Sequence, residues 1–243
     1  MTQTWFSLKA KDDPVGIYPV EFEIEAVRTA LLVVDMQKYG YHPDYALGKL
    51  LQREAPEVFH YLFSRLENIV VPNIRRLLSF FRASNLRVIF LCVGPLLRDG
   101  SDMTPRRRSR DLERLSKTGI NHFFHVGTPE HEILDELRPN SGELVINKNS
   151  TSAFTSTGID QILRNMNIEN LVFTGAATNG CVETTARDAA DRGYNCYLVD
   201  DACATKNQDL HDSTMRNFGL LFGKVITTDE MIKELDALLG RQK

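Results

Sequence analysis

Three side chains of the sequence have the chemistry of nucleophilic acyl transfer: the carboxylate of Asp35, the amine of Lys148 and the thiol of Cys181. Each stands at the end of a short apolar, β-rich run or just after one, a position typical of the carboxyl ends of strands. In a parallel sheet those ends lie on one edge, so residues far apart in the sequence could meet in one crevice. A thiolate, a cation that stabilises it and a carboxylate that moves protons together predict a hydrolytic site.

Cys181 lies in a segment whose pattern predicts a strand, a tight turn and a helix. The run from Leu171 to Phe173 is apolar, Gly175 breaks it, and a helical pattern extends over residues 179–192. Unpaired N–H groups in the first turn of that helix favour an anion, so the thiol is expected to lose its proton more easily than a free cysteine. The alternative is that Cys181 is a small buried hydrophobe.

Asp35 and Lys148 each have a purely structural interpretation as well. Asp35 could cap the turn that follows its strand, and Lys148 could extend its amine from a buried strand to solvent. Either side chain alone would be weak evidence for a site. Their common position at strand ends is what favours a functional interpretation.

Strand-like and helical segments alternate along most of the chain. The apolar runs that predict strands are 30–34, 87–93, 143–148, 171–173, 196–202 and 224–228. Helical spacing is found at 58–84, where Pro72 is expected to kink or divide the helix, and at 129–137, 157–165, 179–192, 211–220 and 229–239. Six strands alternating with helices predict an α/β fold with a parallel sheet and helices on both of its faces.

Length and composition predict a single domain over residues 1–243, with residues 1–27 as an extended arm. A formal net charge of −3 argues against nucleic acid or an anionic membrane as a partner. No apolar run is long enough to span a bilayer and the N-terminus lacks the apolar region of a signal peptide, so a cytoplasmic protein is expected. The four cysteines show no CxxC or zinc-finger spacing, which predicts reduced thiols.

Residues 94–128 have the least regular pattern of the chain. They contain a run of arginines that could bind phosphate or nucleic acid. Its members are Arg106, Arg107, Arg108 and Arg110. Acidic residues surround the run, which favours a solvated or subunit-contact segment instead.

Three motifs resemble those of the isochorismatase-like cysteine hydrolase superfamily: DMQ after the first strand, NKNSTSAF at the end of the third, and TGAATNGCVETTARDAADRGY around Cys181. The similarity covers about residues 29–228. It implies a three-layer αβα, Rossmann-like fold with a six-stranded parallel sheet in the order 3-2-1-4-5-6. It also implies a catalytic triad of Asp35, Lys148 and Cys181, a cis peptide between Ala176 and Ala177, and an oxyanion hole formed by the N–H groups of Ala177 and Cys181.

The motifs also discriminate between branches of the superfamily. Nicotinamidases carry an Asp-x-His metal motif after the second strand, whereas here GPLLRDGSDM follows Val93 without a histidine, so neither a metal nor nicotinamide is expected. Several isochorismatase-type vinyl ether hydrolases lack the cysteine, so its presence favours C–N hydrolysis. TGAATNGCVETT and GPLLRDGSD are most similar to ureidoacrylate and biuret-type amidohydrolases. The resemblance thus predicts an enzyme that cleaves a small amide or ureido compound through a thioester, releases ammonia or an amine, and needs no cofactor.

Several residues near the motifs are candidates for walls of the substrate pocket, although core packing, capping or solvent exposure would explain them equally well. They are Tyr39, Tyr41, Phe154, Asn179 and Glu183. The resemblance further implies a homo-oligomer, a dimer or a tetramer. The sequence also bears on two other classes of function. The intact triad residues argue against a non-catalytic binding protein, and the lack of a resolving cysteine close to Cys181 argues against a redox-sensing thiol protein.

Overall fold

The computed structural model describes residues 20–120 and 124–240. Most of the expected N-terminal arm, residues 1–19, lies outside the described residues. Residues 20–25 belong to no helix or strand, and a short 3-10 helix, η1 (Ala26–Arg28), follows them. The ring of Phe22 packs edge-on against Tyr197 with the centroids 5.2 Å apart, so this segment lies against the rest of the protein.

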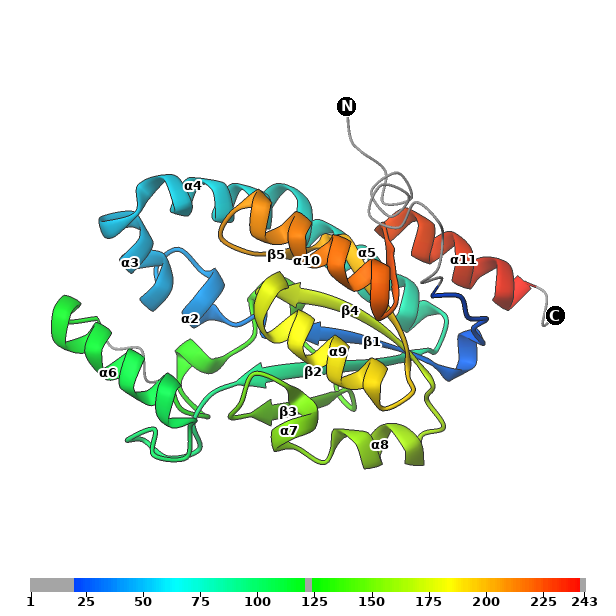
Figure 1. Cartoon of the computed structure of the whole chain (residues 1–243), viewed down its shortest axis with the longest axis horizontal. Helices are drawn as coiled ribbons and strands as arrows, with labels where there is room; N and C mark the ends of the chain where they lie inside the picture. The colour runs from blue at the N-terminus through cyan, green and yellow to red at the C-terminus, as the bar shows by residue number, and fades with distance from the viewer. Residues whose placement is uncertain (1–19, 121–123, 241–243) are drawn as a thin grey trace.

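Six parallel strands form one sheet (Figure 1). They are β1 (Thr29–Val34), β2 (Arg87–Val93), β3 (Leu144–Lys148), β4 (Asn170–Ala176), β5 (Asn195–Ala204) and β6 (Lys224–Ile226). Their spatial order, β3-β2-β1-β4-β5-β6, confirms the predicted order. The chain builds outward from β1 to β3 and then returns to the other side of β1 with β4. Ligands of such sheets bind at this reversal, outside the carboxyl ends of the strands.

Helices cover both faces of the sheet, which confirms the predicted three-layer αβα arrangement (Figure 1). One face carries α3 (Ala46–Glu54), α4 (Pro56–Arg65), α5 (Val71–Ala83) and α11 (Thr228–Gly240). The other carries α7 (Ala153–Ser156), α8 (Ile159–Asn165), α9 (Glu183–Asp191) and α10 (Gln208–Leu221). At the end of the sheet to which the strands point lie α2 (Lys38–Tyr41) and α6 (Pro105–Thr118).

Strand β1 shows why the centre of the sheet is rigid. All six residues of its sequence TALLVV are buried. Leu31 and Val33 belong to the core on the α5 side, whereas Leu32 and Val34 belong to the core on the α9 side, as the alternation of a strand requires. Burial of each such side chain contributes about 1.5–3 kcal/mol, so the position of the residue that follows β1 is strongly fixed.

Two predicted helices differ from the observed ones. The helix expected at 58–84 is not broken at Pro72; a π-helical turn, η2 (Leu66–Val70), joins α4 to α5 just before the proline, which has no N–H to donate. The helix expected at 129–137 consists of two 3-10 turns, η3 (Pro129–His131) and η4 (Asp135–Leu137).

The region 94–128 also contains more regular structure than its pattern indicates. Helix α6 spans 14 of these residues, and Asp111 is its one buried member. An apolar stripe is what reveals a helix in a sequence, and α6 has none.

Gly175 lies inside β4 rather than ending the strand, and it permits a close approach of β4 to β1. Its φ of +109° favours glycine, and a Cβ built on it would lie 2.1 Å from the carbonyl oxygen of Val34. Val34 immediately precedes Asp35. A side chain at position 175 would therefore displace the end of β1 at the point where the carboxylate begins.

We expect Gly175→Ala to lower the free energy of unfolding by about 3 kcal/mol, because left-handed strain of about 1–2 kcal/mol adds to overpacking of about 1–3 kcal/mol. Gly142→Ala is the matched control, since Gly142 has a φ of +90° with open space around its Cβ position. Urea unfolding of both variants measures the difference. Equal losses of stability would show that the contact with Val34 is unimportant.

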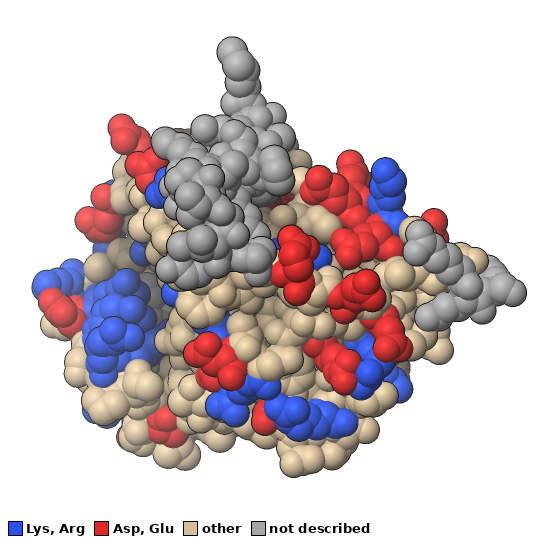
Figure 2. Space-filling view, turned by 45° about the vertical axis from the view of Figure 1, so that its right-hand side comes forward, with Lys and Arg blue, Asp and Glu red and all other residues tan. Residues whose placement is uncertain are grey.

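Acidic and basic side chains are interspersed on the face shown in Figure 2, with a compact group of Lys and Arg at its left edge. Across residues 20–120 and 124–240, no helix has both the length and the apolar character needed to cross a membrane. The four cysteines are all unpaired.

Candidate active site

The carboxyl ends of β1 and β3 and the turn after β4 bring Asp35, Lys148 and Cys181 together. The Nζ of Lys148 donates a hydrogen bond of 2.9 Å to the Oδ2 of Asp35, and both side chains are almost completely buried. The thiol of Cys181 is close enough to interact with both groups. A cavity of about 450 Å³ has Asp35 and Cys181 in its wall, and its size suits a small organic molecule.

Asp35 has a backbone conformation that is uncommon for a residue other than glycine. Its φ of 52° lies in the left-handed region, and its N–H donates to the carbonyl of Leu91 in the neighbouring strand β2. Because Oδ2 is bonded to Lys148, the second oxygen matters for the chemistry. Oδ1 is buried and has no hydrogen-bond partner among the described residues, so it is available to accept a proton.

Cys181 is held in a π-helical turn, η5 (Thr178–Val182), rather than in the first turn of a regular helix. The peptide bond between Ala176 and Ala177, just before this turn, is cis. Gly180 has non-helical torsion angles (φ −130°, ψ −111°), and helix α9 starts only at Glu183. The thiol therefore precedes the helix and reaches the cavity from a sharply bent segment.

The resting thiol is protonated, contrary to the expectation from the sequence. Burial and the carboxylate of Asp35 raise the pKa of Cys181 to about 12, and attraction to Lys148 offsets this only in part. Burial lowers the pKa of Lys148, but Asp35 and Cys181 outweigh burial, so the net pKa is raised and the amine stays charged. The site thus contains a thiol beside a proton acceptor, not a preformed thiolate.

Side chains of β5, of α10 and of the loop between them hold the turn η5 in place. Thr178 is hydrogen-bonded to the Nδ1 of the buried His211 at 3.0 Å, and the Nε2 of His211 lies 2.6 Å from Asp200. The hydroxyl of Thr205 donates to Asn179 at 2.7 Å. These positioning residues were not predicted, because polar residues in this part of the sequence have no spacing that separates a buried network from an ordinary surface.

Three of the five candidate pocket residues line the cavity. They are Tyr39, Tyr41 and Asn179. The two residues expected to form the oxyanion hole, Ala177 and Cys181, line it as well.

The structure places the two other candidates away from the cavity. Phe154 is buried in the core beside α9, with its ring centroid 5.8 Å from that of Tyr194. Glu183 accepts hydrogen bonds from Arg187 and Thr214. Apolar packing accounts for the first position and ion pairing for the second, so the expectation of pocket walls fails for both.

Three arginines of α6 line the same cavity: Arg106, Arg107 and Arg110. The sequence favours a solvated or subunit-contact position for this run. Arg106 and Arg110 are exposed, as that interpretation expects, whereas Arg107 is half-buried; their place in the cavity wall was not predicted. Arg106 and Arg110 lie four residues apart and so share a face of the helix, and Arg107 lies about 100° further round it. This spacing is informative only when the segment is known to be helical. The side chain of Asn149, next to Lys148, donates to the carbonyl of Asp102 at 2.8 Å. This hydrogen bond connects the loop that precedes α6 to the wall of the cavity.

No three His, Cys, Asp or Glu side chains within the described ranges are grouped as a metal site. His131 is instead hydrogen-bonded to the Oδ1 of Asn147 at 2.8 Å, and burial lowers its pKa.

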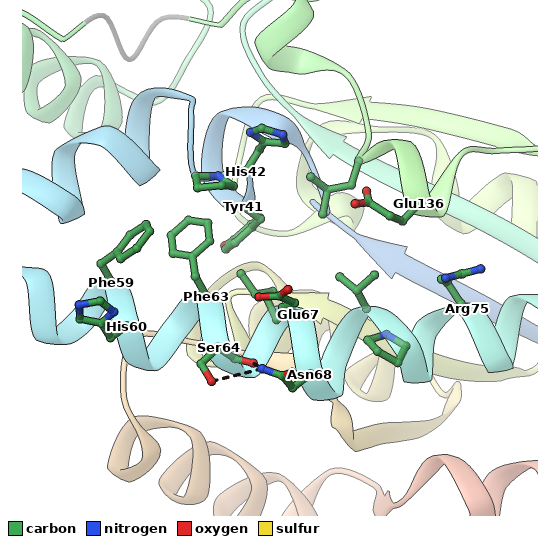
Figure 3. Close-up of a pocket in the computed structure, with 15 residues that line it drawn as sticks. Tyr41, His42, Phe59, His60, Phe63, Ser64, Glu67, Asn68, Arg75 and Glu136 are labelled. Atoms are coloured by element: carbon green, nitrogen blue, oxygen red, sulfur yellow. Dashed lines mark hydrogen bonds between the residues drawn. The ribbon is translucent and has the colours of Figure 1, made fainter.

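A second cavity, of about 640 Å³, lies between the α4–α5 segment and the residues after β1 (Figure 3). Figure 3 shows Phe59 and Phe63 rising from α4 toward Tyr41 and His42 on the opposite side. Neither the thiol, the amine nor the carboxylate described above belongs to its wall. Tyr41 lines both cavities.

Comparison with known proteins identifies the family of this chain. The family model of the isochorismatase domain matches residues 29–230. The chain belongs to the isochorismatase family. Among its relatives in this family, the ureidoacrylate amidohydrolase of Serratia proteamaculans is 30% identical over 246 residues, with 97% of this chain and 91% of the relative covered. The ureidoacrylate amidohydrolase of Acinetobacter baylyi is 31% identical over 236 residues, with 93% and 88% covered.

Solved structures agree with this membership of the isochorismatase family. A cysteine hydrolase from Pseudomonas syringae pv. phaseolicola superposes with a TM-score of 0.72 at 29% identity, covering 90% of this chain and 97% of that one. N-carbamoylsarcosine amidase from Thermoplasma acidophilum gives 0.59 at 27% identity, covering 84% and 98%. Together these relatives confirm the predicted family and the predicted enzyme class, a cysteine hydrolase of C–N bonds.

We expect Asp35→Asn to accelerate alkylation of Cys181 by iodoacetamide near neutral pH. Removal of the negative charge lowers the pKa of the thiol, and only the thiolate reacts. In the unsubstituted protein the rate should rise about tenfold per pH unit throughout the range below the pKa of the thiol.

Mass spectrometry of the peptide that contains Cys181 measures these rates. Asp188→Asn is the control, because Asp188 bonds to Ser152 and Arg192 and is not part of the cavity wall. Slower alkylation in Asp35→Asn would mean that Asp35 already holds the thiol proton in the resting protein.

Proposed function

We propose that this protein hydrolyses a C–N bond of a small amide or ureido compound, with Cys181 as the nucleophile, Asp35 as the general base and acid, and Lys148 as the charge-stabilising residue. The observation that carries the proposal is the buried contact between Lys148 and Asp35 beside a thiol at the wall of a small cavity. The free oxygen of Asp35 supports its role as proton acceptor.

The first chemical step joins proton transfer to attack. Oδ1 of Asp35 takes the proton from the thiol while the sulfur bonds to the carbonyl carbon of the substrate, and the ammonium of Lys148 stabilises the negative charge on sulfur. A free thiolate would be costly because the pKa of the thiol is raised. When attack accompanies proton transfer, the negative charge leaves the sulfur as the new bond forms, so no free thiolate accumulates.

The second step expels the nitrogen. The N–H groups of Ala177 and Cys181 stabilise the tetrahedral oxyanion, and donors of this kind are each typically worth about 3–4 kcal/mol. The C–N bond breaks, Asp35 returns its proton to the departing nitrogen, and ammonia or an amine leaves a thioester on Cys181. Asp35 then takes a proton from water, the hydroxide attacks the thioester, and the acid product leaves as the thiol regains its proton.

The choice of substrate class follows from the relatives and from the cavity. Relatives of 30% and 31% identity are ureidoacrylate amidohydrolases, and a structural relative is an N-carbamoylsarcosine amidase. A volume of about 450 Å³ with a largely polar set of lining residues supports a small ureido or carbamoyl compound.

The apolar side chains on the surface support a homo-oligomer. Leu96 and Leu97, in the loop after β2, are 63% and 54% exposed. A second copy covering this loop would remove that apolar area from water. Light scattering of the purified protein tests this part of the proposal; a monomer at all concentrations would refute it.

Cys181→Ala should lower kcat for ammonia release at least about 10³-fold, because the thioester can no longer form. The substrate panel comprises ureidoacrylate, biuret, carbamoyl amino acids and simple primary amides, with nicotinamide and isochorismate as compounds that should not react. Cys196→Ala is the matched control, since it removes a buried thiol outside the cavity. Undiminished ammonia release by Cys181→Ala would disprove the mechanism.

A further inference from the structure

The cavity that contains Cys181 has an excess of positive charge at the end formed by α6. It adjoins a smaller cavity of about 140 Å³, and the two share Tyr39, Arg107 and Arg110 in their walls. Five cationic side chains line this pair of cavities. They are Arg106, Arg107, Arg110, Arg114 and Lys206.

Few carboxylates balance these cations. The two cavity walls contain Asp35, which is paired with Lys148, and Asp111. Asp111 lies 3.3 Å from Arg107 and 3.6 Å from both Arg110 and Arg114, so a single carboxylate is shared among three guanidinium groups.

The cations that line the two cavities repel one another. Burial together with repulsion from Arg114 and Arg110 lowers the pKa of Lys206, and burial and Arg110 likewise lower the pKa of Arg114. Arg106 forms no hydrogen bond or ion pair with any described residue. An anion bound here would relieve this repulsion and find several unused N–H donors.

Arg107 is the member of this group that is most firmly held. Its guanidinium lies over the ring of Phe124 at 5.7 Å and donates to the hydroxyl of Tyr39 at 3.4 Å, while Tyr39 stacks on Phe124. Its side chain is 20% exposed, so it still reaches the cavity. A planar guanidinium held in this way is suited to bidentate binding of a carboxylate, with little entropy left to lose.

We propose that Arg107, with Arg106 and Arg110, binds a carboxylate of the substrate while its amide or ureido carbon lies at Cys181. This inference rests on the proposed function and narrows it from small C–N compounds in general to ureido or amide acids. Neutral compounds such as biuret then become poor substrates. Arg106, Arg107 and Arg110 set specificity, and the cationic wall also draws anionic substrates into the cavity.

The test compares a ureido acid, N-carbamoyl-β-alanine, with its methyl ester, which differs only in charge at the carboxyl end. The protein should hydrolyse the acid with a kcat/KM at least about 10-fold above that of the ester, and the preference should fall as salt rises. Arg107→Met should lower kcat/KM for the acid about 10–100-fold, mainly through KM, and change the ester less than about 3-fold.

Two variants control for the structure of α6. Arg108→Met removes an arginine of the same helix that bonds to the carbonyl of Asp99 and lies outside both cavities, and it should leave the preference unchanged. Arg107→Lys keeps the charge without the forked geometry and should restore part of the preference. Equal hydrolysis of acid and ester, or an equal loss for both in Arg107→Met, would overturn the carboxylate subsite.

A binding measurement tests the carboxylate subsite separately from the proposed hydrolysis. Calorimetry with Cys181→Ala requires no turnover, and the acid should bind at least about 10-fold more tightly than the ester, with that advantage lost when Arg107→Met is added. Tight, Arg107-dependent binding of the acid without hydrolysis by the unsubstituted protein would refute the proposed function and retain the subsite. Hydrolysis of both compounds without any preference would do the reverse.

Discussion

The buried ion pair between Lys148 and Asp35 is the interaction on which the rest of the site depends. Removing two charges from water costs several kcal/mol per ion, and only close geometry with further hydrogen bonds repays it. Here the Nζ of Lys148 lies 2.9 Å from the Oδ2 of Asp35, and it also donates to the carbonyl of Ser150 at 3.2 Å. Since Asp35 follows the central strand β1 and Lys148 ends the edge strand β3, the pair can close only if β2 and both its neighbours keep their register.

The same pair divides the work of the carboxylate between its two oxygens. Oδ2 is committed to the amine, which keeps the group charged and oriented, and Oδ1 remains for the thiol. The left-handed backbone at Asp35 and the close approach permitted by Gly175 are local costs of this placement. They are offset by the fully buried β1 and β4, whose residues pack into cores on both faces of the sheet.

The sheet could be predicted from the sequence because buried parallel strands are continuous apolar runs, and polar residues directly after such runs mark its functional edge. Asp35 and Lys148 stand out for this reason. Helix α6 does not, since its polar residues give no hydrophobic period, and the cavity position of its arginines depends on that helix. Phe154 was wrongly expected in the pocket wall, because an aromatic residue beside a motif packs in a core as readily as in a pocket. The predicted direction of the Cys181 pKa shift was wrong. That direction depends on burial and on the distance to Asp35, and neither can be read from the spacing of residues in the sequence.

A protonated nucleophile has a consequence for the durability of the protein. Peroxides oxidise thiolates to sulfenic acid far faster than they oxidise thiols, so a permanently ionised cysteine is vulnerable whenever its cavity is empty. With its pKa raised to about 12, Cys181 stays in the less reactive form until a substrate carbonyl is in place. The carboxylate beside it thereby restricts the reactivity of the sulfur to the moment of catalysis and spares it from oxidants between turnovers.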